Sequence, residues 1–228
     1  MVRSVLKRKM LDTLRSWRAE KGAECLLIKG ARQVGKSYIV AEFGRQDYES
    51  FISIDFIGSP DLKRVFDGPI DADSIYRQIS LVVPGVRFVP GRTLLFLDEI
   101  QECPRARAAL KYLALDGRCD VVASGSLLGI RFKEEAALAS IPVGYEREVE
   151  MGPLDFEEYL WARGYGEDDI ANLREYYESL MPVPVAVNQK MMQMLREYLA
   201  VGGMPAVVDA FARTGNFAVA FDEQSRLL

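Results

Sequence analysis

One stretch of this sequence has the residues to hold phosphate. Residues 30–37 read GARQVGKS, so that Gly30 and Gly35 flank four residues and are followed by Lys36 and Ser37. This is the spacing of a P-loop, whose glycines let several backbone N–H groups turn toward one point. In such a loop Lys36 reaches the β- and γ-phosphates of a nucleotide, and the Ser37 hydroxyl binds Mg²⁺. The loop alone leaves three outcomes open for the phosphate: it is bound as a switch, transferred to an acceptor, or cut off by water.

A second motif bears on that choice. Residues 93–100 read TLLFLDEI, an apolar strand that delivers Asp98 and Glu99 to the end of a sheet. A carboxylate at the position of Asp98 holds Mg²⁺ in P-loop proteins, and the next carboxylate is placed to orient or deprotonate an attacking water. Glu99 as a cap of the following turn, or as half of an ion pair, is the alternative. The two adjacent carboxylates favour hydrolysis over binding alone.

Polar side chains also end the following strand, which reads VVASGS. Ser124 or Ser126 is expected to hydrogen-bond the γ-phosphate or the attacking water, and the sequence does not choose between them. A strand end built from small residues that turn the chain is the alternative.

These motifs predict ATP and Mg²⁺ as ligands, with Glu99, Lys36, Ser124 and Ser126 as catalytic residues and Ser37 and Asp98 as metal ligands. The predicted nucleotide contacts are Gly30, Ala31, Arg32, Gln33, Val34, Gly35, Lys36, Ser37 and Tyr38.

The elements that position these residues follow from the apolar pattern. Short buried strands are expected at 24–30, 50–57, 93–100, 119–126 and 147–151, with helices between them. Strands alternating with helices predict an α/β fold with a parallel sheet covered on both faces. From Asp155 the pattern becomes helical, so we expect a core at 1–154 and an all-α lid or connector at 155–228. The last residues begin a helical pattern without a cap, which predicts a fragment of a longer protein, with a frayed native terminus as the alternative.

Composition narrows the functional classes. The chain of 228 residues contains no histidine, which excludes Ser-His and Cys-His catalysis, and its three widely spaced cysteines form neither a disulfide framework nor a zinc pattern. No apolar run has the ~18 residues of a membrane span. We therefore expect a cytoplasmic protein. In residues 1–22, Lys and Arg outnumber acidic residues seven to two, which indicates a solvated helix face or a contact with DNA or a protein partner.

Several segments together resemble one family. GARQVGKS, TLLFLDEIQECP, ASGSLLG, PLDFEEYLWA and YLAVGGMPAVV occur in the order seen in the prokaryotic AAA-type ATPases that carry a C-terminal domain of unknown function. The resemblance implies a P-loop NTPase fold of three α/β/α layers with strand order 5-1-4-3-2. It also implies ATP and Mg²⁺ bound by Lys36, Ser37, Asp98 and Glu99, and that domain beyond residue 228.

The chain departs from the family pattern at one position, and the resemblance does not identify the partners. Relatives more often carry a basic residue where this chain has Tyr145, so that either Arg147 replaces it or the contact is lost. A homo-oligomer would supply an arginine in trans, but the sequence does not select one from Arg105, Arg107, Arg131 and Arg147, for each of which a surface role is the alternative.

Two functions follow from these observations. The first is Mg²⁺-dependent ATP hydrolysis coupled to conformational change. The second is a nucleotide-gated binding module with little hydrolysis, which would bridge DNA or a regulator. A phosphotransferase is disfavoured, because the sequence shows neither an acceptor site nor a lid of arginines.

Overall fold

The computed structural model describes residues 6–20, 22–126 and 144–227. Its contacts divide the chain into two compact units, which are treated separately below. The sheet unit is Met10–Met151, and the helical unit combines Met1–Lys9 with Gly152–Leu228. These contacts group residues 152–154, and the residues before Met10, with the helices. The assignment of functional domains at 1–154 and 155–228 stays a prediction.

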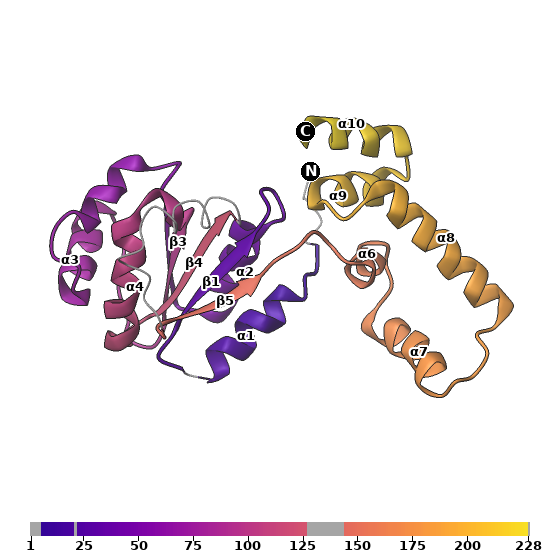
Figure 1. Ribbon diagram of the computed structural model, residues 1–228, viewed down its shortest axis with the longest axis horizontal. Helices are drawn as coiled ribbons and strands as arrows, with labels where there is room; N and C mark the ends of the chain where they lie inside the picture. The colour runs from indigo at the N-terminus through magenta and orange to yellow at the C-terminus, as the bar shows by residue number, and fades with distance from the viewer. Residues whose placement is uncertain (1–5, 21, 127–143, 228) are drawn as a thin grey trace. The chain divides into compact units, whose positions relative to one another are not determined.

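A five-stranded sheet forms the centre of the sheet unit (Figure 1). All its neighbouring strands pair in parallel, in the order β2-β3-β4-β1-β5. This is the predicted order 5-1-4-3-2 read from the other edge, so the fold class is confirmed. The strands are β1 (Cys25–Gly30), β2 (Ser50–Asp55), β3 (Thr93–Asp98), β4 (Asp120–Ser126) and β5 (Glu146–Glu150).

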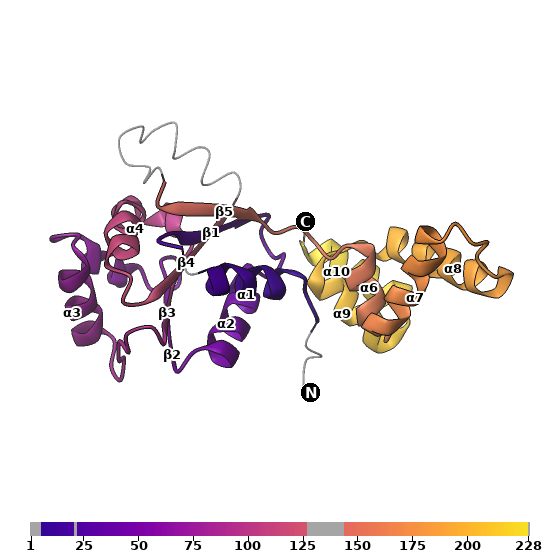
Figure 2. The same cartoon turned by 90° about the horizontal axis from the view of Figure 1, so that it is seen from below.

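Helices cover both faces of this sheet. In Figure 2, α1 (Met10–Glu20) and α2 (Lys36–Asp47) lie on one face, and α3 (Ala72–Val82) and α4 (Pro104–Asp116) lie on the other. Two 3₁₀ turns, η1 (Pro60–Phe66) and η2 (Ile100–Glu102), follow β2 and β3. Successive strand residues point to opposite faces. Leu95 and Leu97 accordingly pack in the core beneath α3 and α4, and Leu94 and Phe96 are buried on the other face.

The N-terminal helix begins at Met10, and Met10, Leu14 and Trp17 form its buried face. Leu6 lies before this helix, four residues from Met10, and packs against the core of the helical unit. Spacing alone could not reveal this, because the residues between them are held by acidic partners in the helical unit.

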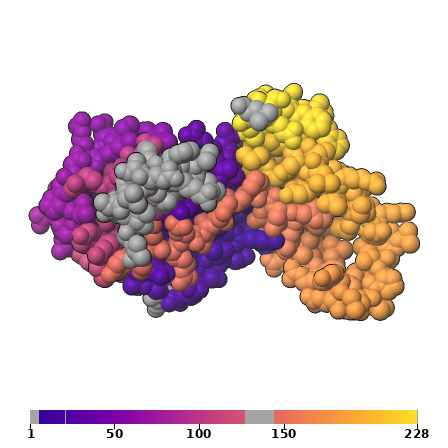
Figure 3. Space-filling view, in the orientation of Figure 1, coloured from indigo at the N-terminus to yellow at the C-terminus, as the bar shows by residue number. Residues whose placement is uncertain are grey.

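The helical unit consists of α6 (Phe156–Ala162), α7 (Glu167–Glu178), α8 (Val185–Val201), α9 (Pro205–Thr214) and α10 (Phe217–Leu227). Its core gathers Tyr159, Val207 and Phe211 with smaller apolar residues of α8 and α10. Helix α7 has no buried residue. The surfaces of α7 and α8 are drawn in orange in Figure 3. No helix in the described part of the chain combines the length and the apolar character needed to cross a membrane.

Two of the motifs that carry the family resemblance meet in the helical unit. The Leu154 N–H donates to the Gly203 carbonyl at 2.7 Å, and the Leu154 carbonyl accepts from the Tyr198 hydroxyl at 2.8 Å. A Cβ placed on Gly203 would lie 2.2 Å from the Leu154 oxygen. The backbones of the PLDF and GGMP segments therefore lie so close together that only glycine fits at position 203.

We expect Gly203→Ala to destabilise the helical unit by about 1–3 kcal/mol, because its new methyl group would push the two backbones apart. The chain has two tryptophans, and Trp161 lies in α6. Urea unfolding followed by Trp161 fluorescence, with Trp17 replaced by Phe, reports on this unit. Gly152→Ala is the matched control, since its Cβ meets nothing within 4 Å. Equal midpoints for the two variants would contradict the close approach.

Candidate functional site

The glycine loop leaves β1 at Gly30 and enters α2 at Lys36. Gln33 and Gly35 both have left-handed backbone conformations, with φ of 65° and 95°. Gly35 is the N-cap of α2 and provides no side-chain cap, so no N-cap side chain occupies the first N–H groups of the helix. Such N–H groups, together with the helix dipole, favour an anion.

The first residue of the loop is fixed by the neighbouring strand. A Cβ on Gly30 would lie 2.2 Å from the Met151 carbonyl oxygen. The Met151 N–H donates to the Lys29 carbonyl at 2.8 Å. The position therefore requires glycine for packing, and the loop begins in direct contact with the chain that follows β5.

Lys36 is buried and lies across the mouth of the loop. Its Nζ donates to the carbonyls of Gly30 at 3.0 Å and Ala31 at 2.8 Å. Burial lowers the pKa of Lys36, and the nearby carboxylates of Glu99 and Asp98 act in the opposite direction. The proximity of these charges places the lysine and the two acidic residues in one site.

The other loop residues differ in how far they are exposed to solvent. Ala31, Arg32, Gln33, Ser37 and Tyr38 are exposed, whereas Val34 is fully buried. The Val34 side chain therefore belongs to the core, and a nucleotide contact at this position would have to come from its backbone. The Ser37 hydroxyl stands where an exposed ligand can reach it.

Asp98 is buried at the end of β3 and carries a defined set of hydrogen bonds. Its Oδ1 accepts from the Ser124 hydroxyl and from the Glu99 N–H, the latter at 3.0 Å. Within the described residues its Oδ2 accepts no hydrogen bond. One oxygen is thus held by the protein while the other is available to a further ligand.

The two candidate serines occupy different places. Ser124 is fully buried and donates to Asp98. Ser126 is the last residue of β4, lies level with Gly30 in the β1–β4 register and is partly buried. The structure brings both to the edge that carries the loop and distinguishes their surroundings. Which of them senses phosphate stays a prediction.

Glu99 has an unusual backbone conformation. Its φ of 54° and ψ of 47° are left-handed, and it forms the N-cap of η2. For a residue with a side chain this conformation costs about 1–2 kcal/mol. Its Oε2 accepts a hydrogen bond from the Gln101 side-chain amide. The sequence did not predict Gln101, because its contact depends on the left-handed turn at Glu99, which the residue types do not indicate.

The arginine candidates lie elsewhere. Arg147 pairs with Glu20 and Glu24, near the start of β1 and away from the loop. Arg107 forms a largely buried ion pair with Glu146 at 2.7 Å. Arg105 donates to the backbone carbonyls of Phe66 and Gly68, and Arg131 lies outside the described residues.

The basic residues near the N-terminus are engaged within the helical unit. Lys7 pairs with Glu167, and Lys9 pairs with Asp155 at 2.7 Å. Arg8 is buried and forms an ion pair with Glu158 at 3.1 Å. Each of these three basic side chains thus has an acidic partner within the helical unit.

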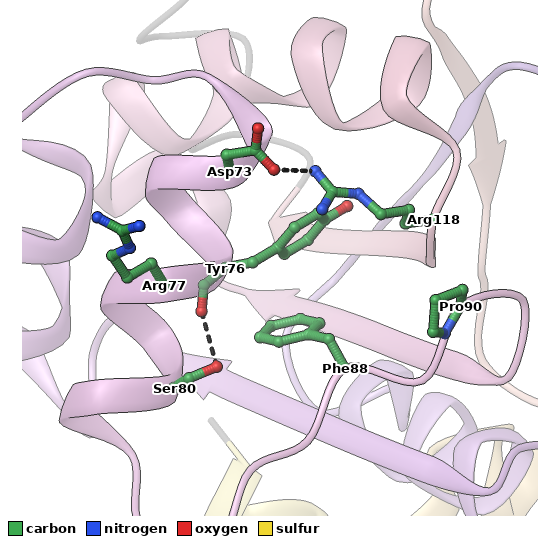
Figure 4. A pocket seen from close by; sticks show the side chains of 7 residues that line it. All are labelled: Asp73, Tyr76, Arg77, Ser80, Phe88, Pro90 and Arg118. Atoms are coloured by element: carbon green, nitrogen blue, oxygen red, sulfur yellow. Dashed lines mark hydrogen bonds and ion pairs between the residues drawn. The ribbon is translucent and has the colours of Figure 1, made fainter.

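A cavity of about 490 Å³ lies elsewhere in the sheet unit (Figure 4). Its lining includes Tyr76, Phe88 and Arg118, and Arg118 pairs with Asp73 and Asp116. Arg118 lies just before β4 begins, whereas the P-loop follows the end of β1. Because the strands are parallel, the cavity lies at the N-terminal ends of the strands, opposite the ends that carry the P-loop. It therefore does not belong to the P-loop site.

A parallel sheet of order 5-1-4-3-2, with a P-loop after β1 and two carboxylates after β3, defines the class of P-loop nucleoside triphosphatases. The sequence pattern of the AAA domain family matches residues 23–160, more than half of the chain. The chain belongs to the AAA domain family. Membership supports nucleotide binding at the P-loop as its general property.

One solved structure supports this fold, and two others are more distantly similar. The Walker-type ATPase PABY2304 of Pyrococcus abyssi is 16% identical, with a TM-score of 0.55 over 98% of this chain and 72% of that one. The Aeropyrum pernix ORC1 protein in complex with DNA is 13% identical, with a TM-score of 0.47 over 99% and 66%. The ORC2 protein of the same organism, in its ADPNP–ADP complexes, is 16% identical, with a TM-score of 0.42 over 70% and 51%. The chain thus spans about half the length of the ORC2 protein. No curated protein matches.

The left-handed backbone at Glu99 is open to a direct test. We expect Glu99→Gly to be more stable than Glu99→Ala by about 1 kcal/mol, because glycine adopts this conformation without a steric penalty. Both variants lose the carboxylate, so the lost bond to Gln101 cancels in the comparison. Urea unfolding followed by Trp17 fluorescence, with Trp161 replaced by Phe, measures the difference. A more stable alanine variant would show that Glu99 does not have this conformation.

Proposed function

We propose that this chain binds ATP with Mg²⁺ at the P-loop and hydrolyses it to ADP and phosphate. The observation that carries the proposal is the grouping of Lys36, Asp98 and Glu99 at one sheet edge, with Asp98 held by hydrogen bonds and Glu99 beside it. Phosphate binding alone requires the loop, whereas hydrolysis also requires a group that activates water.

The oxygen groups present fit Mg²⁺. Mg²⁺ prefers hard oxygen ligands and usually keeps several waters, so a few protein ligands beside the substrate phosphates suffice. Asp98 offers its Oδ2, and Ser37 offers an exposed hydroxyl. Within the described residues no three acidic, Cys or His side chains gather to form a denser metal cage. When bound, Mg²⁺ would supply neutralisation of the phosphate charge.

The chain's own residues perform the remaining steps. The backbone N–H groups at the start of α2 bind the phosphates, and Lys36 would exchange its two carbonyl partners for the β- and γ-phosphate oxygens. Glu99 accepts a proton from the attacking water while the oxygen of that water forms a bond to the γ-phosphorus. The bond from the γ-phosphorus to the bridging oxygen breaks, and that oxygen leaves on ADP.

We further propose that nucleotide state is coupled to the helical unit. The Gly30–Met151 contact links the first residue of the P-loop to the last residue of the sheet unit. The chain enters the helical unit at the next residue. A cytoplasmic location, homo-oligomers with an arginine supplied in trans, a C-terminal domain beyond residue 228, and DNA or protein partners belong to the same proposal.

Lys36→Ala is expected to weaken ATP binding at least tenfold, because it removes the cation that would meet the β- and γ-phosphates. Titration with a fluorescent ATP analogue measures the affinity. Lys111→Ala, at an exposed position of α4, is the matched control and should leave the affinity unchanged. Unchanged affinity in Lys36→Ala would argue against the whole site.

Glu99→Gln is expected to keep ATP affinity and to reduce phosphate release by at least a hundredfold, because the amide cannot accept the proton of the attacking water. Glu102→Gln is the control on the same turn, where Glu102 lies 3.7 Å from Lys63. If the wild-type chain binds ATP tightly but releases phosphate no faster than background, the nucleotide-gated binding module is favoured instead.

A further inference from the structure

The carboxylate of Glu99 is held on one side only. Its Oε2 accepts a hydrogen bond from the Nε2 of Gln101. Its Oε1 accepts no hydrogen bond from any residue that the structure describes, and the side chain as a whole is half-buried. One oxygen is therefore anchored by an amide, and the other is available to a water or a substrate.

Gln101 is well suited to act as an anchor because its own position is fixed. It is 7% exposed and lies in η2 between Glu99 and the start of α4. The Glu102 N–H donates to the Glu99 carbonyl at 2.9 Å, and the Cys103 N–H donates to the Ile100 carbonyl at 3.0 Å. Ile100 is fully buried. The short turn therefore has little freedom to move the amide away from the carboxylate.

The chemistry of the anchor also fits a base. A lysine or arginine at this place would form an ion pair and reduce the ability of the carboxylate to take a proton. An amide donates a hydrogen bond without carrying a charge. It fixes the orientation of the carboxylate, which matters because an error of about 1 Å in a catalytic group can cost about a hundredfold in rate.

We propose that Gln101 is the positioning residue for Glu99, holding Oε2 so that Oε1 faces the attacking water. The inference rests on the proposed function of Glu99 as the base of ATP hydrolysis. It assigns the third residue after the end of β3 to the hydrolytic site, and it explains why Glu99 has a left-handed backbone that turns the chain directly into η2.

The first experiment removes the donor at nearly constant volume. Gln101→Met in the full chain is expected to lower kcat for phosphate release about 10- to 100-fold while KM and ATP affinity stay within about twofold. Gln46→Met is the matched control, because Gln46 also donates to a glutamate, Glu42, but on the exposed surface of α2. Thermal unfolding of both variants shows whether the fold is retained.

The second experiment uses pH to restore the donor. In Gln101→Glu the new carboxylate repels Glu99 at neutral pH, but its protonated form can donate a hydrogen bond as the amide does. Turnover relative to wild type should therefore rise as pH falls in Gln101→Glu and stay flat in Gln101→Met. A purely structural role for Gln101 would not produce this difference.

A double mutant separates this inference from the function on which it rests. Gln101→Met should cause no further loss in a Glu99→Gln background, because residues that act as a unit are not additive. Full activity of Gln101→Met, where Glu99→Gln is inactive, would overturn the positioning role alone. Phosphate release that Glu99→Gln does not reduce would overturn both the proposed function and the role of Gln101.

Discussion

The register of the parallel strands is the constraint on which the site depends. β1 and β4 run level with each other to Gly30 and Ser126, and β3 pairs with β4 through Leu97 and Ala123. β3 ends one residue later, at Asp98, so it stops level with the end of β2 and two positions short of the end of β4. The resulting step leaves Asp98 and Glu99 below the level of the P-loop, in the place where the proposed function requires them.

The polar contacts at that step support one another. The Ser124 hydroxyl can reach Asp98 because the register brings them to the same level of adjacent strands. The Glu99 N–H donates to the same oxygen, which holds the chain as it turns into η2. Asp98 thus organises the backbone in addition to its proposed role as a metal ligand. A change at Ser124 would disturb Glu99 through Asp98 without touching it.

Local patterns predicted the parts of the site that depend on local geometry. The spacing of GARQVGKS fixed the loop, and the apolar run before Asp98 fixed β3, because both follow from neighbouring residues. The strand order needed the family resemblance, since apolar runs do not state which strands pair. Gln101 was missed because its contact requires the left-handed turn at Glu99, which a sequence of ordinary residues does not indicate. The partners of Lys7, Arg8 and Lys9 were missed because they lie about 150 residues away along the chain.

The segments most particular to the family have a structural explanation that catalysis does not supply. PLDF and GGMP are held together by Leu154 and Gly203, and Asp155 and Glu158 form a capping box that begins α6. Those two acidic residues also pair with Lys9 and Arg8. The same carboxylates therefore start the helix and secure the residues that precede α1, so the chain both leaves and re-enters the helical unit at one acidic cluster.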